Sequence, residues 1–223
     1  MDGFQTSLIL ENHEELIFGA MMTLKITSVS FVFALVLGTM VGVARSRLGW
    51  LNLILTPYVE VFRGTPLLIQ LFFIYYGLPS LGISMENFTA AYLGIGLCGG
   101  AYISEIIRGS LYAVDKGQQE AAVSLGLSRF QSLWHIILPQ AVQVALPALV
   151  NSFSSQLKET SLVSVLAINE LTRAGQMVYS RTFRPFEIYL AVGLMYFIMT
   201  YTVSLLSRYL EKKFKVSGKF SSV

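Results

Sequence analysis

Two oppositely charged residues inside a long apolar segment are the first candidates for chemistry. Glu60 and Arg63 stand three positions apart, so on a helix they share one face and can pair. Two prolines and a glycine interrupt the helix beside them: Pro57, Gly64 and Pro66. A broken helix exposes backbone groups and helix ends that can bind a carboxylate or an ammonium inside a membrane. Glu60 and Arg63 therefore either belong to a binding site or neutralise each other and only shape the kink.

Other charges border apolar segments as well. Glu105 and Arg108 repeat the three-residue spacing near the end of their segment, where the guanidinium can reach lipid headgroups, and we favour a structural role for them. Four polar residues follow the fourth apolar segment and could line a cavity or its outer mouth: Lys158, Glu159, Thr160 and Ser161.

The composition indicates which kind of protein must position these groups. Of 223 residues, 54% are apolar and 13% are charged, whereas a soluble domain carries about 25% charged residues. The apolar residues cluster in runs long enough to cross a bilayer. An integral membrane protein is predicted, and a disordered chain, a disulfide-stapled secreted domain and an ordinary cytosolic enzyme are excluded. Cys98 is the only cysteine and cannot form an intrachain disulfide.

Five segments are long enough to span the membrane, so we predict an all-α protein with five transmembrane helices. The second segment is expected to consist of two helical pieces joined near Arg63–Pro66 that cross once overall. The acidic N-terminus has no basic residue before Lys25 and is not expected to be a cleaved signal peptide. The five predicted spans are Leu16–Ala44, Trp50–Leu78, Phe88–Leu111, Ile136–Leu157 and Ile188–Leu210.

Basic residues predict the orientation of the chain. An N-terminus outside and a C-terminus inside places ten basic residues in inner segments and four in outer ones, as the positive-inside rule favours. The loop 158–187 holds the four outer ones and is expected to re-enter the bilayer or pack against protein. The predicted parts are an extracytoplasmic segment (1–15), one membrane domain (16–211) and a cytoplasmic tail (212–223).

Small residues predict close helix packing. Gly38 and Gly42 form a G-x-x-x-G pattern in the first span, and four glycines lie close together in the third. Such positions let helix backbones approach, either within one bundle or across a dimer. The four glycines of the third span are Gly94, Gly96, Gly99 and Gly100.

The loop 115–139, between the third and fourth spans, has a readable helix–turn–helix pattern. Residues 118–125 are good helix formers, and Gly126 stands where a helix end favours a left-handed residue. Ser128 can cap a second short helix, and Pro139 can open or kink the next span. One face of the second helix is apolar, which suits either an interfacial helix or a docking element. Its residues are Leu127, Phe130, Leu133 and Trp134.

The same loop resembles the EAA loop of ABC-importer permeases. Glu120-Ala121-Ala122, then three residues and Gly126, then nine residues and Ile136-x-Leu138-Pro139, carry the resemblance. Three further segments are similar to the polar amino-acid branch of that family, and the resemblance covers roughly Gly19 to Glu211. These segments are Glu60–Leu67, Gln70–Pro79 and Lys158–Leu162.

The resemblance implies a type I importer permease in a bacterial cytoplasmic membrane, with two permease subunits, identical or paralogous, around one pathway. It implies an ABC ATPase homodimer, an extracytoplasmic solute-binding protein, an amino-acid substrate and surrounding lipid as partners, and no nucleic acid. It also implies that the EAA loop forms cytoplasmic coupling helices seated in a groove of the ATPase. The residues assigned to coupling are Glu120, Ala121, Ala122, Gly126, Leu127 and Ser128.

No phosphate-binding loop is present in the sequence. Gly218-Lys219-Phe220 lacks the Ser or Thr and the upstream glycine of that motif, so ATP and Mg²⁺ are expected on a partner ATPase. No motif of a membrane hydrolase or zinc enzyme occurs either, so we expect no catalytic residue, metal or cofactor in this chain. The alternative class is a secondary transporter or channel subunit, but such carriers usually show paired halves, and no internal repeat is visible.

Within the importer interpretation, the polar groups at the kink and after the fourth span form the predicted substrate path. Arg63 and the amides around Gly64, Thr65 and Pro66 suit a carboxylate, because planar donors match that group. Glu60, or Glu159 among Lys158–Ser161, suits an ammonium. The stretches Ser180-Arg181-Thr182-Phe183 and Glu187-x-Tyr189-Leu190 look most like cystine importers, so cystine is the favoured substrate within the polar amino acids.

Overall fold

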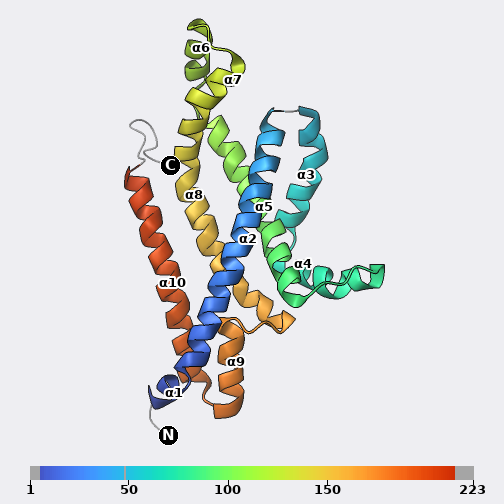
Figure 1. Cartoon of the computed structure of the whole chain (residues 1–223), viewed down its shortest axis with the longest axis vertical. Coiled ribbons are helices and arrows are strands. Elements are labelled where there is room, and N and C mark those ends of the chain that lie inside the picture. The colour runs from blue at the N-terminus through green and yellow to red at the C-terminus, as the bar shows by residue number, and fades with distance from the viewer. Residues whose placement is uncertain (1–5, 48, 214–223) are drawn as a thin grey trace.

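The computed structural model describes residues 6–47 and 49–213, and every element within these ranges is helical (Figure 1). Four helical segments are long and apolar enough to cross a membrane, and each contains one predicted span. Helix α2 begins before the first predicted span. The candidate span that contains α8 also includes the helical turns before it. The four helices are α2 (His13–Arg47), α5 (Asn87–Tyr112), α8 (Leu138–Glu159) and α10 (Pro185–Lys213).

Helices α2 and α5 pack backbone against backbone through small residues. A Cβ atom at Gly38 would lie 2.7 Å from the carbonyl oxygen of Gly100, and one at Gly42 would lie 2.6 Å from that of Ser104. Any larger residue would force the two helices apart. The close packing predicted from the G-x-x-x-G spacing is therefore confirmed within one chain.

The second predicted span is sharply bent. Helix α3 (Gly49–Gly64) ends at the predicted break, and α4 (Leu67–Phe72) begins after Pro66. Pro66 has no amide hydrogen and disfavours a helical residue before it, so the helix stops there. The two pieces are bent by 107°, and the described residues contain four candidate membrane spans, or five if this bent pair counts as one. A straight crossing over Trp50–Leu78 is thus not observed.

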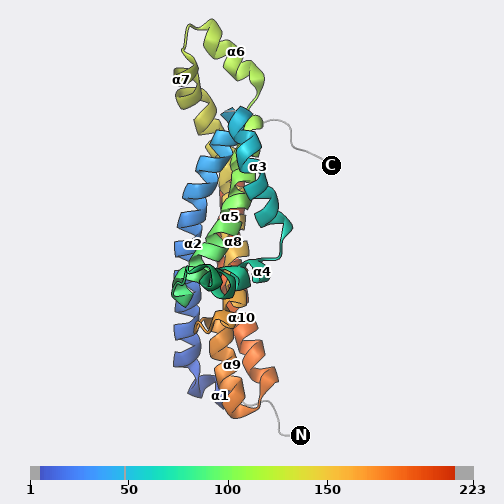
Figure 2. The same cartoon turned by 90° about the vertical axis from the view of Figure 1, so that its right-hand side faces the viewer.

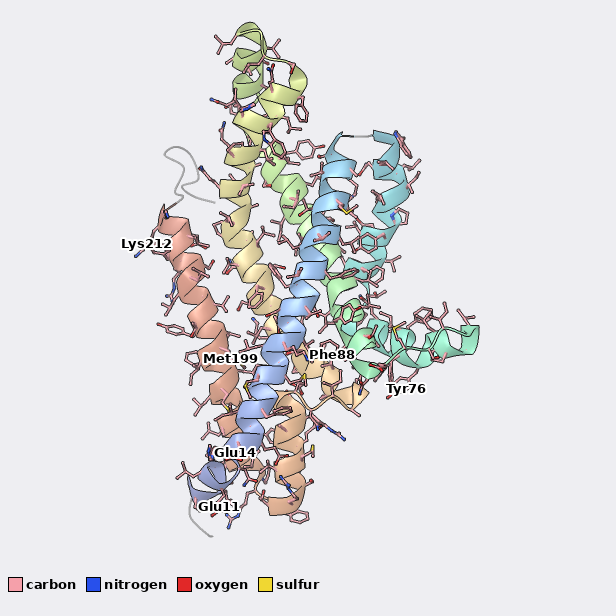
Figure 3. The ribbon with its side chains drawn as sticks, viewed as in Figure 1. Glu11, Glu14, Tyr76, Phe88, Met199 and Lys212 are labelled. Carbon is pink, nitrogen blue, oxygen red and sulfur yellow. The ribbon has the colours of Figure 1, made fainter. Side chains whose placement is uncertain are left out.

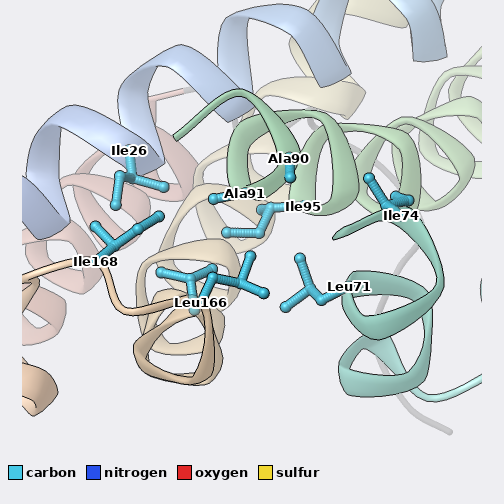
Figure 4. Packing of buried hydrophobic residues seen from close by; sticks show 9 residues of the cluster. Ile26, Leu71, Ile74, Ala90, Ala91, Ile95, Leu166 and Ile168 are labelled. Atoms are coloured by element: carbon cyan, nitrogen blue, oxygen red, sulfur yellow. The ribbon is translucent and has the colours of Figure 1, made fainter. Parts of the chain in front are cut away.

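The chain beyond the break forms an arm, residues 67–81, that projects sideways from the bundle (Figure 1). The arm continues α4 through a π-helical turn, η1 (Phe73–Gly77), and a 3₁₀ turn, η2 (Leu78–Leu81). Its base is fixed by apolar packing against α5 and the segment after α8 (Figure 4). The buried cluster there consists of Ile26, Leu71, Ile74, Ala90, Ala91, Ile95, Val163, Leu166 and Ile168.

The predicted loop 158–187 is mostly helical and packs against protein. A 3₁₀ segment, η4 (Thr160–Leu166), follows α8, and the short helix α9 (Leu171–Thr182) follows in turn. The buried face of α9 lies against the start of α2 and the first turns of α10. Of the two expectations for this loop, packing against protein is confirmed. The residues of this contact are Leu16, Leu171, Ala174, Val178, Ile188, Ala191 and Val192.

The basic segments assigned to the inside lie toward one end of the molecule. The end of α2, the start of α3, the helices α6 (Lys116–Ser124) and α7 (Arg129–Ser132), and the end of α10 with Lys212 lie toward it (Figures 1 and 3). Helix α9 and α1 (Thr6–Glu11) lie at the opposite end in both cartoon views (Figure 2). Residues 1–5 and the predicted tail beyond Lys213 lie outside the described residues.

Candidate functional site: the helix break and the 115–139 loop

The first half of the 115–139 loop is a capped helix that ends in a tight turn. The Asp115 carboxylate accepts a hydrogen bond from the Gly117 amide at 2.7 Å and caps α6. At the other end Gly126 has φ +80°, its amide donates to Val123, and the Leu127 amide donates to Ala122. This pair of bonds is a Schellman motif, which favours glycine at the left-handed position. The turn predicted at Gly126 is confirmed.

The second half of the loop begins with a reciprocal cap. The Ser128 hydroxyl accepts from the Gln131 amide at 3.3 Å, and the Gln131 side chain accepts from the Ser128 amide at 2.9 Å. This capping box starts α7, which continues through a π-helical turn, η3 (Leu133–Ile137), into α8. The N-cap predicted at Ser128 is confirmed.

The outer surface of this loop presents two aromatic rings and the Glu120 carboxylate. Ala122 is buried, Leu127 is half-buried, and Ala121, Gly126 and Ser128 are exposed. The rings of Phe130 and Trp134 stack 6.3 Å apart, with 71% and 58% of these residues exposed. The exposed Glu120 carboxylate makes no ion pair or hydrogen bond within the described residues. Exposed aromatic rings beside an unpaired carboxylate can dock into an apolar groove that offers a cation.

The helix break is held by a residue that the sequence analysis did not single out. The side-chain amide of Gln70 is buried and donates to the carbonyl oxygens of Phe62 and Thr65 and to the Thr65 hydroxyl, each at 2.9 Å. These bonds satisfy carbonyls that the end of α3 leaves without an intrahelical partner. The sequence signal that could have identified Gln70 is a side-chain amide a few residues after the Gly-Thr-Pro break.

Glu60 and Arg63 do not form an ion pair. Both side chains are exposed, and Arg63 instead lies over the Tyr102 ring of α5, 5.4 Å from its centre. Glu60 has no hydrogen-bond or ion-pair partner within the described residues. The idea that the two charges neutralise each other therefore has no support in this structure, and both groups are available to a ligand.

Glu105 and Arg108 do pair, at 2.6 Å, as predicted. A third residue completes this group: Arg45 of α2, whose side chain is only 6% exposed, also binds Glu105 and donates to Asn52 and Thr56. Arg45 is one of the ten basic residues assigned to the inner segments, and it forms a buried link between α2, α3 and α5. The structural role favoured for this pair is consistent with that position.

The segments at the break and at the end of α8 lie against the same two turns of α5. The Tyr58 hydroxyl donates to Leu97 at 2.7 Å, and the Cys98 thiol donates to Phe62 at 3.5 Å. From the other side, the buried Gln156 side chain contacts Gly99. The two segments also meet directly, because Leu71 of α4 lies in one buried cluster with Val163 and Leu166 of η4.

The end of α8 presents two charges without ion-pair partners in the described residues. Lys158 is exposed and Glu159 is half-buried. The Thr160 hydroxyl donates to Leu157 at 2.7 Å, and the Ser161 hydroxyl donates to Lys158 at 2.8 Å, so both serve the helix end. Gln156, one turn earlier, has both amide atoms buried without a partner in the described chain. Sequence analysis missed it because a single glutamine carries no motif.

Comparison with known proteins gives the family. The family described as "Binding-protein-dependent transport system inner membrane component" matches residues 34–216. The glutamine transport system permease protein GlnP of Escherichia coli (strain K12) is 41% identical over 204 residues, covering 90% of this chain and 93% of that protein. The L-cystine transport system permease protein TcyB of Bacillus subtilis (strain 168) is 37% identical over 197 residues, covering 87% and 84%.

Solved structures agree with this result. A chain from the "Crystal structure of an amino acid ABC transporter with histidines" superimposes with a TM-score of 0.89 at 37% identity, covering 96% of this chain and 99% of that one. A chain of the MetNI methionine ABC transporter, at 20% identity and a TM-score of 0.74 over 96% of this chain and 99% of that one, shares the fold. The chain therefore belongs to the family of binding-protein-dependent transport system inner membrane components, as a permease subunit of an amino-acid ABC transporter.

Proposed function

We propose that this chain imports a polar amino acid across a bacterial cytoplasmic membrane. It would work with a second permease subunit, an ABC ATPase homodimer that binds ATP and Mg²⁺, and an extracytoplasmic solute-binding protein. The observation that carries the proposal is the 41% identity to a glutamine permease over nine-tenths of the chain. No feature of the fold favours a secondary transporter or a channel.

Glutamine and cystine are the two substrates that the relatives' names suggest, and cystine is the one favoured by the Ser180–Phe183 stretch. The test is uptake of labelled L-cystine and L-glutamine into proteoliposomes that hold the permease, its ATPase and its solute-binding protein. ATP-dependent accumulation of either supports import of a polar amino acid. Uptake without the ATPase would support the secondary transporter instead.

The 115–139 loop is the proposed coupling element, with its contacts made by Glu120, Ala121, Ala122, Gly126, Leu127 and Ser128. Gly126→Val should weaken ATPase binding, because valine is strained at a φ of +80°. Glu120→Lys should weaken it by reversing an exposed charge that has no ion-pair partner among the described residues. The measurement is the amount of ATPase that co-purifies with each variant. Glu86→Lys, an exposed reversal before α5, is the control, and full ATPase retention in both loop variants would contradict the assignment.

The proposed substrate path comprises Glu60, Arg63, Gly64, Thr65 and Pro66 at the break. It also comprises Lys158, Glu159, Thr160 and Ser161 at the end of α8. Both groups border the stretch of α5 from Leu97 to Tyr102. Arg63→Gln and Glu60→Gln should each lower uptake about tenfold while the protein still assembles with its ATPase, since one tenfold change needs only about 1.4 kcal/mol of binding.

Arg208→Gln is the matched control for Arg63→Gln. Arg208 lies over the Tyr201 ring at the same 5.4 Å separation, but on α10 and away from the break. Its uptake should match that of the wild type. Rescue of uptake in the double variant of Glu60 and Arg63 would favour a structural pair, and normal uptake in both single variants would remove them from the path.

The proposed orientation has the N-terminus outside and the C-terminus inside. Cysteines at Glu11 and Ser84, in a Cys98→Ala background, should react with an impermeant thiol reagent in intact cells. Cysteines at Lys116 and Lys212 should react only after lysis. All four positions are exposed, so the opposite pattern would reverse the orientation rather than report burial.

A further inference from the structure

A pocket lies between α9 and the first turn of α10, at the end of the molecule opposite the 115–139 loop. Its volume is about 470 Å³, within the range of about 300–1,000 Å³ that small-molecule sites occupy. It is lined by Arg173, Gln176, Met177, Tyr179, Ser180 and Tyr189. None of these residues belongs to the helix break or to the 115–139 loop.

The pocket is on the polar side of α9. The helix buries Leu171, Ala174 and Val178 against α2 and α10, and Arg173, Gln176 and Ser180 form the opposite stripe at helical spacing. This stripe lies beside the first turns of α10, which is apolar enough to cross the membrane. Polar groups beside a membrane-spanning helix generally face a water-filled cavity or a partner rather than lipid.

Arg173 is the one cation of the pocket, and its charge is not neutralised within the described residues. Its guanidinium forms no ion pair or hydrogen bond there, and its Nε atom is buried. The two arginines that follow in the sequence are paired, Arg181 with Glu15 and Arg184 with Glu187 at 3.6 Å. A buried donor without an acceptor costs stability, so an arginine left this way is suited to an external anion.

Glu170, the carboxylate spaced to pair with Arg173 along a helix, already has other hydrogen-bond partners. Glu170, three positions earlier, is fully buried and accepts from the amides of Thr172 at 2.9 Å and Arg173 at 2.8 Å, and from the Tyr196 hydroxyl at 2.7 Å. Its carboxylate therefore caps α9 and does not reach the guanidinium. None of the described residues that line the pocket carries a carboxylate that would compete with an incoming anion.

The remaining lining suits an amino acid. Tyr179 and Tyr189 place their rings 5.9 Å apart at 44°, which forms an aromatic wall whose faces attract an ammonium. The guanidinium offers paired donors that match a carboxylate. Gln176 and Ser180 add hydrogen-bonding groups for a polar side chain.

We propose that this pocket binds the amino acid through its carboxylate at the outer end of the permease, before the substrate reaches the helix break. This rests on the proposed function, which makes the substrate an amino acid and this end the extracytoplasmic one. A single guanidinium and aromatic walls give weak, reversible binding, as an entry site requires.

The test is direct binding to the purified complex of permease and ATPase, without the solute-binding protein. Labelled L-glutamine, L-cystine, L-histidine and L-glutamate are each measured by equilibrium dialysis. At least one should bind, and Arg173→Gln should weaken that binding tenfold or more, whereas Arg173→Lys should recover part of it. Gln176→Glu, which places a carboxylate one turn from the guanidinium, should weaken binding similarly. Arg181→Gln makes the same charge change on the same helix outside the pocket and should bind normally.

Decarboxylated analogues test which group is recognised. The amine that corresponds to the bound amino acid, such as 4-aminobutanamide for glutamine, should compete at least tenfold more weakly than the amino acid. Gel filtration of each variant separates lost binding from lost folding.

Four results would overturn the pocket assignment: no binding by any probe, unchanged binding in Arg173→Gln, equal competition by the amine, or binding only when the solute-binding protein is present. Uptake into proteoliposomes judges the proposed function separately. Normal uptake with any of these results overturns the pocket alone, whereas no uptake of any amino acid overturns the function as well.

Discussion

A carboxylate is bound in opposite ways at the two ends of the molecule. Near the 115–139 loop, Glu105 is bound by two guanidinium groups, those of Arg45 and Arg108. At the other end, Glu170 is bound by two backbone amides and a tyrosine, and the guanidinium of Arg173 is left out. Both carboxylates have an arginine three positions later, so this spacing does not decide which of them pairs.

The position of each carboxylate on its helix explains the difference. Glu105 lies inside α5, where residues three apart share one face. Glu170 precedes α9 as its N-cap, so its side chain turns back to the free amides at the helix start. In the first arrangement Glu105 and Arg108 pair with each other. In the second, the guanidinium of Arg173 stays unpaired and could bind a ligand. The candidate binding residues and the structural ones are both charged. They differ in that the candidate binding residues have no ion-pair partner among the described residues.

The largest expected effect is at the paired end. Glu105→Gln leaves the buried Arg45 without its carboxylate and should lower the free energy of unfolding by about 3 kcal/mol, as removal of one partner of a buried pair does. The midpoint of thermal unfolding in detergent measures this. Glu60→Gln removes an exposed carboxylate that has no partner among the described residues, and it should change stability by less than about 0.5 kcal/mol. Equal effects in the two variants would contradict the comparison.

A neutral side chain should matter almost as much where it serves a broken helix. Gln70→Leu removes three hydrogen bonds from the carbonyls and the hydroxyl at the break, and should cost about 2 kcal/mol. The same unfolding measurement applies. Gln143→Leu, on the exposed surface of α8, makes the same exchange without lost bonds and is expected to be nearly neutral. A neutral result for Gln70 would mean that Pro66 alone maintains the bend.

The contact of Arg63 with Tyr102 should be weaker still. Tyr102→Leu removes the ring beneath an exposed guanidinium and should cost about 0.5 kcal/mol beyond the lost packing. A double-mutant cycle with Arg63→Gln isolates this contribution. The cycle of Arg208 with Tyr201 gives the matched value for α10. A coupling well above 1 kcal/mol would make Arg63 a structural residue after all.

Local sequence rules predicted several features correctly because each depends on a few neighbouring residues. The four long spans, the break at Pro66, the left-handed Gly126 and the Ser128 cap all follow from hydropathy or backbone chemistry within one or two turns. The pairing of Glu105 with Arg108 is local in the same sense. The separate crossings were therefore predictable without knowledge of the tertiary fold.

The features that were missed depend on residues far apart in the chain. Arg45 reaches Glu105 across 60 positions, and Gln156 meets Gly99 from another helix. The direction of the arm is set by packing against α5 and η4, which the Gly-Thr-Pro break does not encode. The availability of Arg173 depends on how Glu170 turns at the start of α9, and the i, i+3 spacing suggests the reverse. The candidate binding residues were hence harder to predict than the helices.

The smallest expected effect concerns the pH dependence of the unpaired end. Burial raises the pKa of Glu170 above its ordinary value of 4.5, although the amides of Thr172 and Arg173 and the Tyr196 hydroxyl act in the opposite direction. The folded protein therefore holds this proton more tightly than the unfolded chain does. The resulting stability is fully present below pH 4.5 and is lost as the pH rises through the folded-state pKa.

Glu170→Gln removes this titration, so the stability of the wild type relative to this variant should fall as the pH rises above 4.5. Thermal unfolding of both proteins at a series of pH values from 4 to 8 measures the difference. Tyr196→Phe removes a donor that favours the charged carboxylate, so it should move the fall to higher pH. A difference that is constant across this range, or that grows in the opposite direction, would mean that the donors around Glu170 outweigh its burial. Glu170 would then resemble Glu105, with neutral donors in place of the two arginines.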